Sequence, residues 1–184
     1  MKRYSNVIGP SVLALALAGF PVALRSAAPD GAQDSEQVSK LLSEAKTQAV
    51  FLREDATTME MYTRSTSSWE VHAATVTQMK EHINAAGRTV AKLDEARNLA
   101  SPWQEIAIDR IKPLLKEMAA NTEAEINYIS KNPRRLEDRS YRDYIEANAD
   151  VADKLAGLIS DFVSYGNTKN RLEKLTTRLE VPER

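Results

Sequence analysis

The sequence contains no cysteine, and this absence closes several kinds of chemistry to it. Without a thiol the chain has no disulfide, no thiol nucleophile, no thiolate metal ligand and no thioether attachment for haem. Histidine is nearly as scarce, with 2 residues in the chain. A site built on imidazole would therefore have to use His72 or His82.

Glycine and aromatic residues are also few, with 6 glycines and an aromatic content of 6%. Charged residues reach 28%, alternate in sign and leave a net charge of only −1. This profile favours a soluble helical protein over a β-sandwich or a disordered chain. Such a balanced charge provides no broad attraction to nucleic acid or anionic lipid, so we expect no nucleic-acid partner.

The first 32 residues are typical of a cleaved signal peptide. Lys2 and Arg3 precede an almost wholly apolar run over residues 11–20, and small residues follow at 26–28. The alternative is an uncleaved anchor over residues 7–24, which is close to the shortest length that spans a bilayer and is interrupted by two prolines. Both interpretations predict a periplasmic or secreted protein, with membrane contact only if the segment stays uncleaved.

Apolar residues recur at steps of three and four through the remainder of the chain. The longest stripe runs over residues 140–180, and three more lie within residues 34–62, 67–93 and 101–132. Short connections force neighbouring helices to be antiparallel. The sequence therefore predicts an all-α, up-down-up-down four-helix bundle over residues 33–166, followed by a helical C-terminal extension over 167–184.

Local signals predict where the helices begin. Ser101, Pro102 and Gln104 form the clearest start, with a cap, a proline at the first position and a capping box. The pairs Asp34 with Gln37 and Ser67 with Glu70 predict the first two starts, and Ser140 predicts the last. Gly166 leaves two outcomes open, since the final helix either runs through it or breaks there into a shorter fifth helix.

The two histidines do not form a metal site that we can identify. They are ten residues apart on one predicted helix, which separates them by roughly 80° around the axis. Neither follows a glutamate by three positions, as a ferritin-like di-iron site requires. Haem held between Met59 and His72 is a geometric alternative, but packing roles are the commoner use of such residues. We therefore expect no cofactor.

Polar residues interrupt the apolar stripes at a similar depth on neighbouring predicted helices. This layer lies near the 63–68 and 131–139 connections and could bind a small polar ligand between the helices. The alternative is a buried hydrogen-bond network that fixes the register of the helices. The candidate ligand-binding residues are His72, Thr122, Glu125, Tyr144 and Asn148.

A basic cluster marks the connection before the last predicted helix, at Lys131, Arg134, Arg135, Arg139 and Arg142. Three nearby acidic residues dilute it, so a solvated connector is the main interpretation and a weak anionic partner the alternative. The sequence contains no glycine-rich phosphate loop and no nucleophile motif of the hydrolases.

One stretch carries a resemblance. The run Tyr144-Ile145-Glu146-Ala147-Asn148, continuing through Lys154 to Leu158 and on to residues 169–175, resembles exported bacterial helical proteins with no assigned activity. The resemblance covers the last quarter of the chain and implies export and a helical fold. The overall pattern also resembles four-helix sensor domains of membrane receptors, which is an analogy of fold alone.

These observations predict a non-enzymatic, exported helical bundle that acts by binding or assembly. Leu172, Leu175 and Leu179 lie beyond the predicted end of the bundle, so we expect them to pack on the bundle or on a second copy. An unknown protein partner or self-association through the last helix would follow. The alternative function is a ligand-sensing or cofactor-binding bundle that uses the polar layer.

Overall fold

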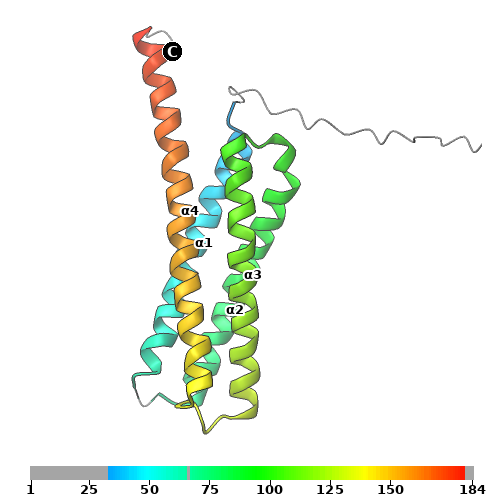
Figure 1. Ribbon diagram of the computed structural model, residues 1–184, viewed down its shortest axis with the longest axis vertical. Helices are drawn as coiled ribbons and strands as arrows, with labels where there is room; N and C mark the ends of the chain where they lie inside the picture. Colours follow the sequence, from blue (N-terminus) through cyan, green and yellow to red (C-terminus); the bar gives the residue numbers. More distant parts are fainter. Residues whose placement is uncertain (1–32, 66, 181–184) are drawn as a thin grey trace, which may run out of the picture.

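The computed structural model describes residues 33–65 and 67–180, so the predicted signal segment lies outside the described residues. Four long helices form this described part: α1 (Glu36–Tyr62), α2 (Trp69–Glu95), α3 (Pro102–Lys131) and α4 (Arg139–Leu179). A single 3-10 turn, η1 (Arg97–Leu99), joins α2 to α3. Each helix runs antiparallel to the next in the chain (Figure 1), which confirms the predicted up-down-up-down bundle.

The core is the set of apolar stripes read from the sequence. Within the described ranges, 26 apolar residues are buried along the shared axis, with contributions from all four helices. Its largest fully enclosed side chains include Leu52, Met79, Ile108 and Leu155. Burial of a side chain of this size stabilises the fold by about 1.5–3 kcal/mol relative to exposure, so the core is the main source of cohesion.

The helix starts show which local signals were sufficient. α3 begins as predicted, with Ser101 as N-cap and Gln104 Oε1 accepting from the Ser101 backbone amide at 2.9 Å. The other three predictions were displaced by one or two residues. The observed N-caps are Ser35 rather than Asp34, Ser68 rather than Ser67, and Asp138 rather than Ser140.

Asp34 does not cap α1 because its carboxylate has three other donors. Its Oδ1 accepts from Ser101 Oγ at 2.7 Å, Trp103 Nε1 at 2.7 Å and Lys169 Nζ at 2.8 Å. Partial burial acts to raise the pKa of Asp34, but the hydrogen bonds from Lys169, Ser101 and Trp103 outweigh it and hold the pKa below its ordinary value. This cluster joins α1, α3 and α4 at the end of the bundle opposite the 63–68 connection.

α4 continues through Gly166, so the structure selects the single long helix from the two predicted outcomes. The presence of a glycine at this position is explained by Trp103, which lies 63 residues earlier in the chain. A Cβ on Gly166 would lie 2.7 Å from the far edge of the Trp103 ring, and this ring also stacks on Phe162 at 6.5 Å between centroids. Glycine therefore serves here as the site of a close helix-to-ring approach rather than as a helix end.

The end of α4 extends past the other helices (Figure 1). Leu172 and Leu179 are 63% and 62% exposed, so the prediction that they pack on the bundle was wrong. Leu175 is partly covered. Association of this extension with a second copy stays a prediction.

Among the helices of residues 33–65 and 67–180, none combines the length and the apolar content that crossing a bilayer requires.

Two glycines of α4 test the role assigned to Trp103. Gly166→Ala should lower the free energy of unfolding by about 1–3 kcal/mol, because the new methyl group overpacks the contact with the ring. Gly157→Ala is the matched control, since nothing lies within 4 Å of its added Cβ. That control should gain roughly 0.5–1 kcal/mol from helix propensity. Urea unfolding measures both, and an equal gain at the two positions would contradict the account of Gly166.

Candidate functional site

Three of the five predicted site residues meet in one buried cluster. Asn148 Nδ2 donates to Thr122 Oγ1 at 2.8 Å and to Glu125 Oε1 at 2.8 Å, joining α4 to α3. Thr122 Oγ1 in turn donates to Met79 Sδ on α2 at 3.4 Å. All three polar residues are at most 2% exposed. The predicted polar layer is thus a three-helix hydrogen-bond cluster in the core.

His72 belongs to a neighbouring buried pair. Its Nδ1 lies 3.0 Å from the hydroxyl of Tyr141, and its ring lies between those of Tyr62 and Tyr141. Burial lowers the pKa of His72, which favours the neutral imidazole. Tyr141 falls on the apolar stripe of residues 140–180, so the sequence pattern did not distinguish its hydroxyl as a polar member of this pair.

Tyr144 does not share this burial. It is 38% exposed, and none of the hydrogen bonds among the described residues joins it to the cluster. The inward line of α4 runs through Tyr141, Ile145 and Asn148, and Tyr144 falls at the edge of that line. Its place in the inward layer was therefore a wrong prediction of side-chain direction.

Glu125 is the most perturbed carboxyl of the cluster. It is 0% exposed, and its Oε2 has no hydrogen-bond partner among the described residues. Loss of solvation by burial raises its pKa to about 7, although the hydrogen bond from Asn148 opposes the shift. The pKa of Tyr141 is raised by burial first and by the negative charge of Glu125 second. The carboxyl group therefore takes up a proton close to neutral pH.

A second polar cluster, missed by the sequence analysis, links α1 to α2. Asp55 is 5% exposed; its two oxygens accept from Gln78 Nε2 at 2.9 Å and face His82 Nδ1 at 2.5 Å. The His82 ring also stacks on Phe51 at 5.5 Å. The available signal was the position of Asp55 within the apolar stripe, beside Leu52. Within the described part of the chain, no group of three or more His, Asp or Glu residues is placed to hold a metal ion.

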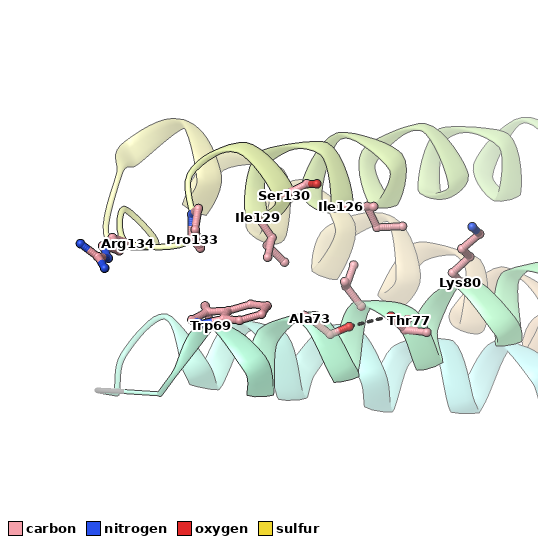
Figure 2. Close-up of a pocket in the computed structure, with 10 residues that line it drawn as sticks. Trp69, Ala73, Thr77, Lys80, Ile126, Ile129, Ser130, Pro133 and Arg134 are labelled. Atoms are coloured by element: carbon pink, nitrogen blue, oxygen red, sulfur yellow. Dashed lines mark hydrogen bonds between the residues drawn. The ribbon is translucent and has the colours of Figure 1, made fainter.

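Two cavities lie on the outside of the bundle, along the seam between α2 and α3. The first has a volume of about 660 Å³ and a floor of Val76, Ile126 and Ile129. Figure 2 shows Trp69 and Ala73 facing Ile129 and Pro133 across it, while Lys80 and Arg134 lie at its opposite ends. This cavity is therefore apolar inside and cationic at both ends.

The second cavity follows along the same two helices and measures about 650 Å³. Small residues line it at Gly87, Ala91 and Ala119, and Arg88 and Lys116 add cationic groups. Its one acidic lining residue, Asp94, is paired with Lys112 at 2.7 Å. We call the two cavities together the α2–α3 groove. The steps of three and four place Val76, Val90 and Ile126 on the inner faces of their helices, so periodicity gives no indication that this seam stays open.

The basic connector divides into two parts. Arg135 pairs with Asp138 at 2.8 Å and Arg139 approaches Asp143 at 3.9 Å, as expected for a solvated connector. Arg134 instead lines the α2–α3 groove. The alternative prediction of an anionic partner for this cluster stays untested, and the groove gives it a location.

No protein-family model matches the sequence, and no curated protein or solved structure matches it either.

Protonation of Glu125 should make stability depend on pH. The folded pKa of about 7 lies above the ordinary value of 4.5, so the folded chain keeps a proton that the unfolded chain has lost. The contribution of this group is fully present below pH 4.5 and falls by about 3 kcal/mol as the pH rises to about 7. Glu125→Gln should abolish that fall and be more stable than the wild type above neutral pH.

Urea unfolding at several pH values measures the effect as the difference between wild type and variant. This subtraction removes the contribution of His72, whose lowered pKa acts in the opposite direction by costing stability as the pH falls. Glu123→Gln, on the exposed side of the same helix, is the control and should leave the profile unchanged. A difference between wild type and Glu125→Gln that does not vary with pH would contradict the account.

Proposed function

We propose that this protein is an exported, non-enzymatic binding protein whose α2–α3 groove holds an amphipathic segment of another protein. The observation that carries the proposal is the pair of aligned cavities on one helix seam, both with apolar floors. Apolar grooves between helices are the usual receptors for the apolar face of a partner helix. Export rests on the N-terminal signal pattern and places the partner outside the cytoplasm.

Polar contacts tie the other helices together. Asp55 with Gln78 joins α1 to α2, and Asn148 joins α3 to α4. At the end of the bundle, Gln104 of α3 donates to Ser35 O at 2.9 Å and so holds the start of α1. The α2–α3 seam keeps cavities that a partner can fill without displacing any of these contacts.

Gly87 supports the same surface. It lies in the middle of α2 and lines the groove, and nothing lies within 4 Å of a Cβ placed on it. A mid-helix glycine costs about 1 kcal/mol relative to alanine, and no contact within the chain offsets that cost. A closely packed partner would offset it.

Ligand sensing at the polar layer is a second candidate because two buried oxygens, Glu125 Oε2 and Asn148 Oδ1, have no hydrogen-bond partner among the described residues. A small polar ligand could satisfy both. Their near-complete burial favours a role in helix register instead, since Asn148 already joins α3 to α4. If the protein acts by assembly instead of by binding a different protein, the exposed leucines of the α4 extension are the surface through which two copies would associate.

Photo-crosslinking from single cysteines tests the groove, and the natural absence of cysteine makes the labelling specific. Ala91→Cys carrying a benzophenone should give one defined protein adduct in cells of the source organism, because Ala91 lines the groove. Lys154→Cys, exposed on α4, is the control. Adding Gly87→Leu should remove the Ala91 adduct by filling the groove. Equal adducts from both positions, or an adduct that survives Gly87→Leu, would contradict the proposal.

A further inference from the structure

We infer that the segment held by the α2–α3 groove is an acidic amphipathic helix, with carboxylates along both borders of its apolar face. This inference rests on the proposed function and names the chemistry of the partner. It follows from three properties of the groove: the sign of its charges, their spacing, and the small residues at its centre.

The charges along the groove are cationic and available. Lys80, Arg88, Lys116 and Arg134 line the two cavities, and none of them forms an ion pair among the described residues. The one acidic residue of the lining, Asp94, already neutralises Lys112. The groove therefore presents four cationic side chains that are not held in ion pairs among the described residues, although the chain as a whole carries a net charge of −1. Charge complementarity favours an anionic occupant.

The spacing of these cations distinguishes a helix from a small amphiphile. Lys80 and Arg88 are separated by about 12 Å along α2, and Lys116 and Arg134 are farther apart on the other border. A fatty acid carries one anionic group and would meet the cations at one end only. A helix with carboxylates on successive turns can meet all four, so the distributed charge favours a helical segment.

The centre of the groove is shaped for close approach of a helix. Gly87, Ala91 and Ala119 present little side-chain volume there, while the cavity bordered by Trp69 has room for a large apolar side chain. Ala73 and Gly87 are about 21 Å apart along α2, or roughly four helical turns. We expect a partner that places a bulky apolar anchor about four turns from a small residue.

Segments of the chain itself fit this groove less well. Over its described residues 167–180, the α4 extension carries four basic residues, Lys169, Arg171, Lys174 and Arg178, against two acidic ones. The N-terminal segment carries three basic residues and one acidic residue. Like charges would face the cationic groove in both cases, so a second copy is disfavoured as the occupant.

Three synthetic peptides of about 22 residues test the inference, because that length matches the groove. They share one apolar stripe and carry glutamate, glutamine or lysine along its borders. Fluorescence anisotropy with the full chain should show the glutamate peptide binding about tenfold more tightly than the glutamine peptide, and the lysine peptide more weakly still. The combined variant Lys80→Glu, Arg88→Glu and Lys116→Glu should reverse the order.

Two glycine variants distinguish the contribution of the groove's shape to peptide binding from the contribution of its charges. Gly87→Leu should abolish binding of every peptide, whereas Gly157→Leu on α4, equally free of neighbours, should leave binding unchanged. Circular dichroism confirms that each variant is folded. Equal binding of the three peptides, all blocked by Gly87→Leu, would overturn the acidic partner and leave the groove function intact.

Other results would overturn both proposals. The groove function fails if no peptide binds, or if binding is indifferent to Gly87→Leu. Stoichiometric displacement of the glutamate peptide by palmitate, with loss of palmitate binding in Gly87→Leu, would replace the helical partner with a small amphiphile.

Discussion

Asn148 holds the interaction on which the arrangement of the bundle depends. Apolar stripes drive four helices together, but dispersion and hydrophobic burial are not directional and would tolerate a shift of one helix along another. The amide of Asn148 donates to Thr122 and Glu125, which are on one helix three residues apart. A shift of α4 by one turn would leave these groups buried and unsatisfied, at a cost of about 1–3 kcal/mol for each. The cluster therefore favours a single register.

With that register fixed, the remaining polar contacts join other pairs of helices, and the two cavities of the α2–α3 groove follow a single seam. Asp34 and Gln104 fasten the end of the bundle where α1, α3 and α4 meet, and Asp55 fastens α1 to α2. Between α2 and α3 the side chains are too small to fill the outer surface, above all at Gly87 and Ala119. The groove is thus a consequence of residue size on a rigidly held pair of helices, which suits a surface that binds with little rearrangement.

Gly166 and Gly87 lack a side chain for different structural reasons. At Gly166 the missing side chain is required by a neighbour within the chain, the ring of Trp103. At Gly87 no neighbour within the chain requires it. The same holds at Gly157, but Gly87 differs from it in lining the α2–α3 groove, where the missing side chain leaves room for a partner.

Sequence periodicity was sufficient for the helices and their order, because burial of an apolar stripe constrains each helix independently of its neighbours. It also brought Thr122, Glu125 and Asn148 to one depth. It could not predict whether the last helix continues through Gly166, since the packing of this glycine involves Trp103 in a different helix. It also could not predict the N-cap of α1, because Asp34 accepts hydrogen bonds from Ser101 and Lys169 instead. Tyr144 was misplaced since a rotation of a few tens of degrees separates inward from exposed positions. The α2–α3 groove could not be predicted because periodicity identifies the buried face of each helix but not how closely two helices pack against each other.

Amide hydrogen exchange, measured on the full chain alone and saturated with the acidic helical peptide, most directly tests the assignment of the binding surface. Added protection should be confined to α2 over residues 73–94 and α3 over residues 112–130, with α1 and α4 unchanged, because the ligand covers the outer seam of a bundle whose register is already fixed. Protection that appears on the α4 extension over residues 167–179, or that spreads evenly over all four helices, would contradict this assignment.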